Sequence, residues 1–250
     1  MKLIRFLIAV LVFISVAANS QTLQPKTNFT SSDTLKIMSW NIRILTTADT
    51  GLIYWNNRKN EVAALVKRYQ PDILGIQEIR NNRQQKELLQ RISDYASISY
   101  GRDNNNGTRG ERLAILYNKK RFSHSENGFF FLSETPEKVS IGWDAVYNRI
   151  CVWCKLTDKT TNKTFYVFNT HFDHIGKIAR EKSAKLITEK INEIAGNFPV
   201  VLTGDFNTTP ADENFYNTLT KTFFDSRESS KYKPNGTIGT FNGWDFTTSD

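Results

Sequence analysis

The sequence predicts a layered α/β domain with mixed β-sheets. Two observations support this class. Short apolar runs with β propensity, such as residues 73–78 and 200–205, alternate in places with amphipathic stretches of helical period, such as residues 178–195. Elsewhere, as in residues 149–170, apolar runs follow one another with only a short turn between them, which is the pattern of hairpins. Strands separated by helices in some places and by turns in others predict a mixed sheet covered by helices.

The first part of the domain has the pattern of two strand–helix pairs. Val62, Leu65 and Val66 recur at helical spacing within residues 55–69, and basic residues gather near the end of that stretch. Pro71 follows and breaks the helix. The expected elements, in order, are a strand over residues 35–42, a helix over 55–69, a buried strand over 73–78 and a helix over 83–92.

The second part has the pattern of antiparallel strands followed by one long helix. Residues 101–110 are rich in Asn, Gly and Arg, which predicts a loop. Ala184, Ile187 and Ile191 recur along one helical face, and Gly196 ends that helix. The expected elements, in order, are strands over residues 113–117 and 122–132, the second with a turn at 126–128, a strand pair over 149–156 and 165–170 around a turn at 158–163, a helix over 178–195 and a strand over 200–205.

The first twenty residues have the pattern of a secretory signal peptide. A basic stretch over residues 1–5 precedes an apolar stretch over residues 6–18, and Ala18 and Ser20 give a small-x-small cleavage pattern. The apolar stretch is short for a membrane span, and an uncleaved N-terminal anchor is the alternative. We expect a signal peptide over residues 1–20, a flexible leader over 21–34 and one domain over 35–250. The mature protein is then exported to the periplasm or the extracellular space, as a monomer without stable membrane insertion.

The chain is basic. It has 33 Lys and Arg against 25 Asp and Glu, a net charge of +8, and removal of Lys2 and Arg5 with the signal peptide would leave +6. A positive surface attracts acidic substrates such as phosphate esters or nucleic acid, but a generally basic surface explains the composition equally well. The sequence has no dense run of Lys and Arg with interleaved aromatic residues, a pattern typical of dedicated nucleic-acid binders.

Two cysteines, Cys151 and Cys154, stand three residues apart in a predicted strand. Such residues face opposite sides of a sheet and lie about 10 Å apart at about 3.3 Å per residue, too far for a disulfide. A zinc site needs more His and Cys ligands, and the chain has 3 histidines. We expect two free thiols that are buried or half-buried.

Polar side chains end four of the predicted strands. Asn41, Glu78 and His171 each follow an apolar run, and Asp205 and Asn207 follow the strand that begins at residue 200. Each alone could simply begin a loop. Together they bring acids, amides and an imidazole to the strand ends, where open α/β sheets bind ligands. The set is therefore more specific than any of its members.

The oxygen donors in this set favour a hard divalent metal. Mg²⁺ prefers oxygen ligands, keeps several waters and uses one or two carboxylates together with substrate phosphate. Glu78 with Asn41 supplies one such site, for Mg²⁺ or Mn²⁺. Zinc would need more His or Cys ligands than the chain offers.

The remaining residues suit the hydrolysis of a phosphate ester. Such a reaction needs an activated water, neutralised phosphoryl oxygens and help for the leaving oxygen. Asp205 can orient or deprotonate water, and Asn207 can position phosphate or a second metal. His171 can donate a hydrogen bond or a proton to the phosphate, and Arg149 offers a fixed positive fork.

The motifs at these positions resemble those of the endonuclease/exonuclease/phosphatase family, the deoxyribonuclease-I-like superfamily. The resemblance implies a four-layer sandwich of two mixed sheets packed face to face with helices outside. It also implies that Glu78 and Asn41 bind the divalent metal, that His171, Asp205 and Asn207 surround the scissile phosphate, and that Arg149 supports them. The matching stretches come in the family's order and cover nearly everything from residue 35 to residue 243; they are residues 38–42, 75–78, 148–149, 169–171 and 204–207.

Other stretches resemble exported bacterial members of this family. This resemblance implies that four further residues shape the substrate pocket, namely Trp143, Asp173, His174 and Arg180. The alternative is that Trp143 belongs to the core and that Arg180 is a surface charge of a helix. The stretches that carry the resemblance are residues 55–58, 131–136, 142–144, 171–174 and 239–243.

The chain departs from the family pattern near its end. Members continue past residues 239–242 with a strand that carries an Asp, and then with a Ser-Asp-His motif that supplies a second imidazole at the phosphate. Ser249 and Asp250 have the first two letters of that motif, but no His follows, so we do not map them onto it. We expect the last strands of one sheet to be missing, an unpaired edge there, and weak or no activity in this form of the chain.

Two hypotheses from different classes follow. The first is an exported, Mg²⁺- or Mn²⁺-dependent phosphoester hydrolase whose substrate is a nucleic acid, a phospholipid head group or a small phosphodiester. Arg102, Arg109 and Arg112 around the predicted loop could grip phosphate in such an enzyme, or could be solvated. The second is a non-catalytic binding protein that kept the fold. The incomplete C-terminal motif favours the second hypothesis, whereas the intact strand-end residues favour the first.

Overall fold

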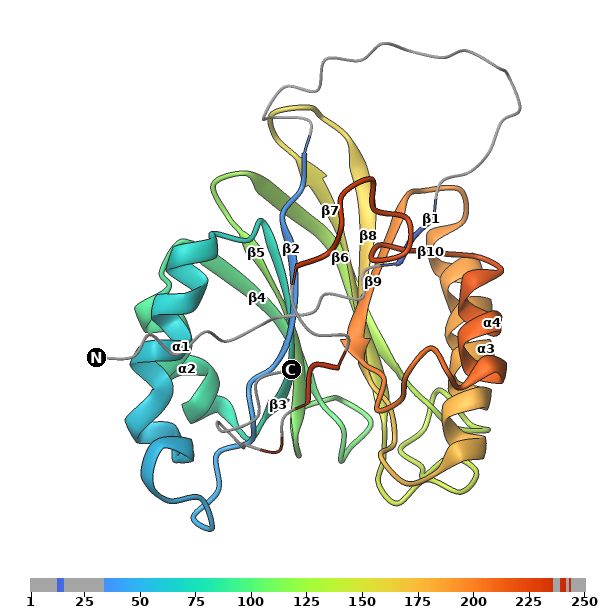
Figure 1. Ribbon diagram of the computed structural model, residues 1–250, viewed down its shortest axis with the longest axis horizontal. Helices are drawn as coiled ribbons and strands as arrows, with labels where there is room; N and C mark the ends of the chain where they lie inside the picture. Colours follow the sequence, from blue (N-terminus) through green and yellow to red (C-terminus); the bar gives the residue numbers. More distant parts are fainter. Residues whose placement is uncertain (1–12, 16–33, 236–238, 242, 244–250) are drawn as a thin grey trace.

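Two β-sheets pack face to face and helices cover both outer faces in the computed structural model, which describes residues 13–15, 34–235, 239–241 and 243 (Figure 1). The strands are β1 (Phe13–Ser15), β2 (Ile37–Asn41), β3 (Ile73–Ile79), β4 (Tyr95–Gly101), β5 (Arg112–Asn118), β6 (Phe122–Phe131), β7 (Ile150–Asp158), β8 (Thr164–His171), β9 (Val200–Asp205) and β10 (Phe224–Asp225). The helices are the short 3-10 helix η2 (Gly51–Ile53), α1 (Trp55–Tyr69), α2 (Asn82–Arg91), α3 (Lys177–Ala195) and α4 (Glu213–Thr220).

Both sheets mix parallel and antiparallel neighbours. One sheet has the order β2-β3-β5-β4 and the other the order β10-β1-β9-β8-β7-β6. β2 runs parallel to β3 and β8 runs parallel to β9, whereas the other neighbours are antiparallel. The predicted mixed α/β class and the implied four-layer sandwich are confirmed. The two parallel pairs matter most for function, because their carboxyl ends meet at one end of the molecule.

Three apolar clusters fill the spaces between the four layers. One lies between the four-stranded sheet and α1 and α2, one between the two sheets, and one between the larger sheet and α3 and α4. Representative buried side chains are Trp55, Val66 and Ile76 in the first cluster, Ile115, Val152 and Val167 in the second, and Phe168, Phe172 and Ile187 in the third. Strands β7 and β8 are apolar on both faces because each face meets a different cluster.

Cys151 and Cys154 face opposite sides of β7, as predicted. Cys151 belongs to the cluster beside α3 and α4, and Cys154 belongs to the cluster between the sheets. Both are free thiols with 0% exposure. Burial raises the pKa of both thiols, which makes them unreactive structural cysteines.

The expected turn at residues 126–128 is wrong, because β6 continues through it. The strand absorbs the irregularity as a bulge between His124 and Glu126. Gly128 lies against the indole of Trp153 on β7, where a Cβ atom would come within 2.9 Å of the ring. The glycine therefore permits a close cross-strand contact rather than a turn. Strands β1, β4 and β10 and helices η2 and α4 are additions to the elements that the sequence predicts.

Two short strands lie beyond β9 in the larger sheet, and the expected absence of the family's last strands stays a prediction. β9 pairs with β1, and β1 pairs in turn with β10. β1 lies within residues 1–20, the predicted signal peptide, whose cleavage stays a prediction. Residues 1–12 and 16–33 lie outside the described part of the chain, and so do Ser249 and Asp250 at the other end.

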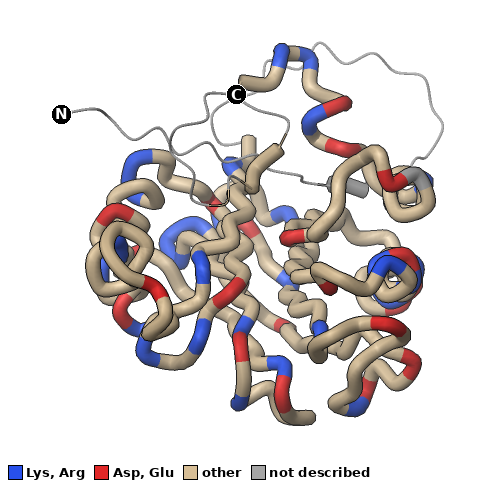
Figure 2. The backbone as a smooth tube through the Cα atoms, turned by 60° about the horizontal axis from the view of Figure 1, so that its bottom comes forward, with Lys and Arg blue, Asp and Glu red and all other residues tan. Residues whose placement is uncertain are grey.

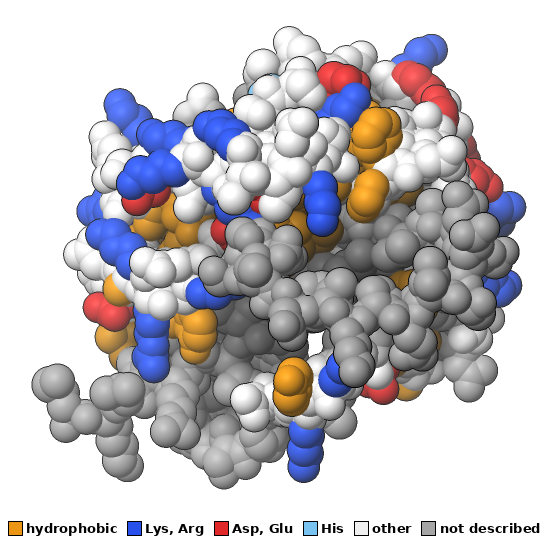
Figure 3. All heavy atoms as spheres, turned by 90° about the horizontal axis from the view of Figure 1, so that it is seen from above, with side chains coloured by type: hydrophobic (Ala, Val, Ile, Leu, Met, Phe, Trp, Pro, Cys, Tyr) orange, Lys and Arg blue, Asp and Glu red, His pale blue; other side chains and the backbone are white. Residues whose placement is uncertain are grey.

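Charged residues of both signs occur around the end of the molecule where the parallel strands finish (Figure 2). Figure 2 brings this end forward and shows Lys and Arg interspersed with Asp and Glu along the described loops. The opposite end, seen in Figure 3, carries Lys and Arg at its periphery and hydrophobic side chains in small groups. Among the described residues, no helix combines the length and the apolar character needed to cross a membrane.

Candidate active site

Asn41 joins the carboxyl ends of the two sheets. It ends β2, and its side-chain Nδ2 donates to Glu78 Oε1 at 2.8 Å and to Asp205 Oδ2 at 2.9 Å. Glu78 belongs to β3 of the same sheet, whereas Asp205 ends β9 of the other sheet. The predicted convergence of these three side chains is therefore present, and it spans the interface between the sheets.

A backbone irregularity directs the carboxylate of Glu78. The pairing of β3 with β5 shifts register between Ile76 and Ile79, and Glu78 itself adopts a left-handed φ of 64°. Such a bulge turns a side chain away from its regular alternation, and the left-handed conformation costs about 1–2 kcal/mol. The backbone N–H of Ile44 donates to Glu78 Oε2 at 3.0 Å, so both carboxylate oxygens have fixed partners.

A buried polar network supports this irregularity from between the sheets. Asn169 on β8 donates from Nδ2 to the carbonyl oxygens of Ile76 and Ala114, each at 3.0 Å, next to the position where β3 and β5 lose register. Its Oδ1 accepts from Gln77 Nε2 at 2.7 Å and from Thr203 Oγ1 at 3.1 Å. Asn169, Gln77 and Thr203 are each at most 1% exposed. The network therefore ties β3, β8 and β9 together directly behind the site.

Arg58 fixes the loop that follows Asn41. Its guanidinium donates to the carbonyl oxygens of Ile42 at 2.6 Å, Arg43 at 2.9 Å and Ile53 at 2.7 Å. The guanidinium also lies 5.1 Å from the ring centre of Trp55. Burial lowers the pKa of Arg58 to about 10, which leaves it charged at neutral pH. The loop that begins at Asn41 is therefore held by buried side chains, Arg58 and also Gln84, which donates to the carbonyl oxygen of Arg43 at 2.9 Å.

Asn207 turns the chain just after Asp205. It has a left-handed φ of 50°, its backbone N–H donates to Asp205 Oδ1 at 3.0 Å, and its Nδ2 donates to the carbonyl oxygen of Phe172 at 2.9 Å. The side chain of Asp205 is 29% exposed and can be reached by a ligand. Asn207 therefore lies beside Asp205, as predicted, and restricts the orientation of its carboxylate.

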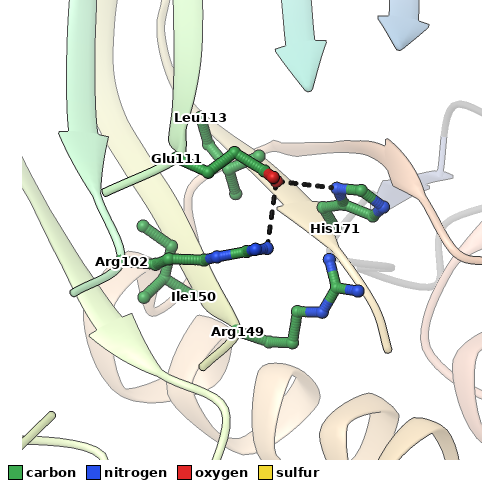
Figure 4. A pocket seen from close by; sticks show the side chains of 6 residues that line it. All are labelled: Arg102, Glu111, Leu113, Arg149, Ile150 and His171. Atoms are coloured by element: carbon green, nitrogen blue, oxygen red, sulfur yellow. Dashed lines mark hydrogen bonds and ion pairs between the residues drawn. The ribbon is translucent and has the colours of Figure 1, made fainter. Parts of the chain in front are cut away.

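His171 ends β8 and lies between two carboxylates. Its Nε2 is 3.8 Å from Asp205 Oδ2, and its Nδ1 is 3.5 Å from Glu111 Oε1 (Figure 4). The Nδ1 contact is too long for a well-formed hydrogen bond, and the nitrogen has no closer partner among the described residues. With 6% exposure, the ring is buried, so the two carboxylates define its electrostatic surroundings.

Glu111 is a site residue that the sequence did not reveal. It precedes β5, its side chain is 12% exposed, and its Oε1 also accepts from Arg102 Nη1 at 3.0 Å. Burial alone would raise the pKa of this carboxyl, but the contact with His171 and the charges of Arg102 and Arg149 lower it on balance. Glu111 is therefore ionised at neutral pH, and its carboxylate can accept a hydrogen bond from an N–H at Nδ1 of His171.

A small cavity lies beside His171 on the Glu111 side. It has room for about one water molecule, far less than the roughly 300–1,000 Å³ of pockets that hold drug-sized ligands. Its lining residues are Arg102, Glu111, Leu113, Arg149, Ile150 and His171 (Figure 4). Asn41, Glu78 and Asp205 are outside this lining, so His171 stands between the cavity and the carboxylate pair.

Arg149 directly precedes β7, and its side chain lines this cavity. Its guanidinium is ion-paired with Asp173, with Nε 3.3 Å from Oδ2, and its Nη2 lies 3.2 Å from Nδ1 of His174. The side chain is 5% exposed. Burial and the nearby charge of Arg102 lower the pKa of Arg149, yet an arginine stays charged. Arg149 thus presents a buried, fixed cation next to His171.

Asp173 holds the loops around the cavity and does not face a ligand. Its Oδ1 accepts from the backbone N–H groups of Ile175 at 3.0 Å and Gly176 at 2.8 Å, and its Oδ2 accepts from that of Val146 at 3.1 Å. Burial opposes ionisation, but these donors and Arg149 lower the pKa of Asp173 to about 2. Because the side chain is 0% exposed, Asp173 acts on the pocket by positioning its loops, and a direct contact with substrate stays a prediction.

The other three residues expected at the pocket have different surroundings. His174 is exposed and stacks on Tyr147, with ring centres 5.9 Å apart. Arg180 is half-buried and donates to the carbonyl oxygen of Asp173 at 3.0 Å, so it supports the same loop. Trp143 is half-buried outside the apolar clusters, and its backbone N–H lies 3.2 Å from Glu134 Oε2. Of the three, only His174 contacts a residue of the cavity.

The donor set at the sheet ends fits a hard divalent cation. The N–H₂ group of Asn41 lies between the carboxylates of Glu78 and Asp205, where a cation would neutralise both. Among the described residues, no three His, Cys, Asp or Glu side chains converge to hold a metal ion by themselves. One or two carboxylates with water and substrate oxygens are what Mg²⁺ uses. Glu78 would hold such an ion. The amide oxygen of Asn41 accepts from the backbone N–H of Arg43 at 2.9 Å, so Asn41 would join Glu78 as a ligand only after its amide turns over.

Comparison with known proteins agrees with this geometry. Residues 38–250 match the Endonuclease/Exonuclease/phosphatase family. An endonuclease/exonuclease/phosphatase from Bacteroides vulgatus is 41% identical in sequence, with a TM-score of 0.71 over 75% of this chain and 70% of that one. A mannosyl-6-phosphatase from Bacteroides thetaiotaomicron is 38% identical, with a TM-score of 0.71 over 75% of this chain and 71% of that one. An uncharacterized protein of Acanthamoeba polyphaga mimivirus is 29% identical over 76% of this chain and 73% of its own length.

The family match covers the whole set of strand-end residues, from Asn41 to Asn207. These residues come from both sheets, so the match and the geometry describe the same site. The chain therefore belongs to the Endonuclease/Exonuclease/phosphatase family and has its phosphoester hydrolase fold.

Proposed function

We propose that this chain is a divalent-metal-dependent hydrolase of small phosphate esters, and that a hexose 6-phosphate is its preferred substrate class. The observation that carries the proposal is the contact of one amide, that of Asn41, with the carboxylates of Glu78 and Asp205. An acidic pair at the meeting point of two sheets, with an imidazole 3.8 Å from one carboxylate, supplies both a cation site and proton-transfer groups.

Each residue has a defined part in such a reaction. Glu78 and Asn41 hold the cation, which when bound neutralises charge on the phosphoryl oxygens. Asp205, which is partly exposed and oriented by Asn207, positions the attacking water and accepts its proton. His171, oriented by Glu111, donates a hydrogen bond to a phosphoryl oxygen. Arg149 adds a buried positive charge on the far side of His171.

The charges around the site favour a small substrate over a nucleic acid. Arg102 is paired with Glu111 at 3.0 Å, and Arg149 is paired with Asp173 at 3.3 Å. Binding of a long polyanion depends on cations that are free to replace its counterions. These paired arginines offer directed hydrogen bonds within a small cavity rather than an open basic track.

The similarity to the mannosyl-6-phosphatase supports the sugar phosphate. That protein shares 38% of its residues with this chain over 71% of its length. Residues 1–20 have the composition of an export signal, so we place this activity outside the cytoplasm.

The test is a hydrolysis assay on the purified full chain. Mannose 6-phosphate, bis(p-nitrophenyl) phosphate and single-stranded DNA are offered with Mg²⁺, with Mn²⁺ and with EDTA. The same assay is run on Asp205→Asn and on the control Asp94→Asn, which removes an exposed carboxylate that pairs with Lys120. We expect metal-dependent release of phosphate from mannose 6-phosphate, its loss in Asp205→Asn and its retention in Asp94→Asn.

Other outcomes would change the assignment. Faster cleavage of the diester or of DNA would make the protein a phosphodiesterase or a nuclease. Hydrolysis that survives EDTA would contradict the metal. Failure to hydrolyse any ester with either metal would leave the non-catalytic binding protein as the better description.

A further inference from the structure

Tyr147 is an exposed aromatic residue in a constrained place. It lies in the segment before β7, and 50% of its surface is exposed. Its backbone N–H lies 3.4 Å from Asp173 Oδ2, the carboxylate that also pairs with Arg149. The loop that carries the ring is thus held by the same buried group that fixes the cationic side chain of the site.

The ring of Tyr147 has three polar neighbours. The guanidinium carbon of Arg102 lies 5.1 Å from its centre, and that of Arg149 lies 6.0 Å away. The ring of His174 stacks on it at 5.9 Å with an angle of 14° between the planes. Contacts of this kind between a cation and an aromatic face are attractive, so they restrict the ring although half of it faces solvent.

These neighbours connect Tyr147 to the catalytic end of the cavity. Arg102 and Arg149 line the cavity together with His171. Both arginines therefore have one side toward the cavity and another toward the Tyr147 ring. A phosphate ester whose phosphate lies near His171 would extend its alcohol portion along these arginines toward the exposed ring.

We propose that Tyr147, His174 and Arg102 form a subsite for the sugar ring of a phosphate monoester; we call these three residues the Tyr147 shelf. The inference rests on the proposed function and adds the residues that select the alcohol portion. The C–H bonds of a pyranose pack against an aromatic ring, and its hydroxyl groups accept hydrogen bonds from guanidinium and imidazole donors. The Tyr147 hydroxyl can donate as well.

The polar character of the shelf favours a sugar over a nucleobase. A base gains most from an aromatic face that is free over its whole area, whereas a guanidinium and an imidazole cover part of the Tyr147 ring and leave half of the residue exposed. What remains accessible is a ring surrounded by hydrogen-bond donors. A group with many hydroxyls satisfies such donors better than a flat base does.

The test measures binding by isothermal titration calorimetry, so that it does not depend on turnover. All proteins carry Asp205→Asn, so that the esters persist during the titration, and the ligands are mannose 6-phosphate, glycerol 3-phosphate and adenosine 5′-monophosphate with Mg²⁺ present. The shelf variants are Tyr147→Ala and Tyr147→Phe. The matched control is Tyr69→Ala. Tyr69 is 47% exposed, and the guanidinium carbon of Arg68 lies 5.8 Å from its ring centre. Tyr69 lies at the end of α1 and not beside the cavity.

We expect Tyr147→Ala to weaken the binding of mannose 6-phosphate about threefold to tenfold, the range of a single aromatic contact. Binding of glycerol 3-phosphate, which has no ring, should weaken by less than about twofold, and Tyr69→Ala should match the Asp205→Asn parent. Tyr147→Phe should fall between the parent and Tyr147→Ala, because it keeps the ring and loses the hydroxyl donor.

Four results would overturn the inference. Equal weakening of both sugar and glycerol esters would mean that Tyr147 only supports the arginines. No change in Tyr147→Ala, or no binding of mannose 6-phosphate by the parent, would mean that the shelf does not hold a sugar. A Tyr147-dependent preference for the nucleotide would replace the sugar with a base. If wild-type protein binds mannose 6-phosphate through Tyr147 but does not hydrolyse it, the shelf stands and the proposed function fails.

Discussion

Glu111 and His171 meet across the interface between the two sheets. Glu111 Oε1 lies 3.5 Å from His171 Nδ1, although one residue precedes β5 and the other ends β8. The imidazole has its other nitrogen toward Asp205. The orientation of this imidazole therefore depends on a carboxylate from the opposite sheet.

Glu111→Gln tests the importance of this pairing. The amide keeps the size of the side chain but removes the negative charge 3.5 Å from His171 Nδ1. We expect kcat for the ester of the proposed function to fall by at least about tenfold, since positioned acid–base groups contribute about 10²–10⁴-fold, while KM changes little. Steady-state kinetics of Glu111→Gln and of the surface control Glu126→Gln, whose carboxylate pairs with Lys155, would decide the matter. An unchanged kcat would show that His171 needs no orienting partner.

Asp173→Asn tests the loop support beneath the cavity. The pKa of Asp173 is lowered to about 2 in the folded protein, so its ionised form stabilises the fold. That contribution is complete above the unfolded pKa of about 3.9 and is lost as the pH falls through about 2. We expect Asp173→Asn to be less stable than wild type at pH 7 by about 3–5 kcal/mol, because Arg149 loses its buried partner.

The pH dependence provides the check on that interpretation. Urea unfolding at a series of pH values between 7 and 3 should show the difference between wild type and Asp173→Asn shrinking at the acidic end. With a pKa of about 2 in the folded and about 3.9 in the unfolded protein, titration accounts for a change of about 1 kcal/mol by pH 3, and for the rest below that pH. A difference that stays constant with pH would mean that the carboxylate acts through shape alone.

Gly75→Ala tests the close contact between the sheets. A Cβ atom at residue 75 would lie 2.3 Å from Thr203 Oγ1 and 2.8 Å from Asn169 Oδ1, both in the buried polar network. We expect a loss of about 1–3 kcal/mol of stability, as in other overpacked cores, measured by thermal or urea unfolding. Gly239→Ala is the matched control, because a Cβ atom at residue 239 would meet nothing within 4 Å, and it should change stability by less than about 0.5 kcal/mol. Equal stability of both variants would contradict the tight contact.

The two cysteines offer a test of the layer assignment. Cys151 and Cys154 are both free and 0% exposed, each in a different apolar cluster. We expect no reaction with Ellman's reagent in the native protein and reaction of both thiols in guanidinium chloride, because only the exposed thiolate reacts. Rapid reaction of one thiol in the native protein would show that one of the two layers opens to solvent.

Much of this fold could be predicted because its patterns are strong. α1 has the bounds that its apolar spacing and Pro71 indicate, and the pair β7 and β8 lies where two apolar runs flank a polar turn. β4 could not be predicted in the same way, because its residues from Tyr95 to Tyr100 are all half-buried and give little contrast in hydropathy. In β6, Gly128 permits a close contact with Trp153, but in the sequence a glycine at this position indicated a turn.

The site was predictable to the extent that its residues end strands. Asn41, Glu78 and Asp205 follow apolar runs, and their contact follows from the meeting of strand ends. Glu111 gave no such signal, because it is a charged residue in a polar loop whose partner is distant in the chain. The positioning role of Asp173 depends on four backbone N–H groups that only the folded loops bring together.

The site draws its groups from two kinds of backbone. Asn41, His171 and Asp205 are the last residues of strands tied to the rest of the core by the buried network. Arg102 and Tyr147, by contrast, stand in loops beside the cavity. Loops accept substitutions and insertions more readily than core strands do. The range of esters that such a scaffold accepts can therefore diverge among descendants of one ancestor, or be exchanged by grafting loops in the laboratory, while the hydrolytic centre is inherited unchanged.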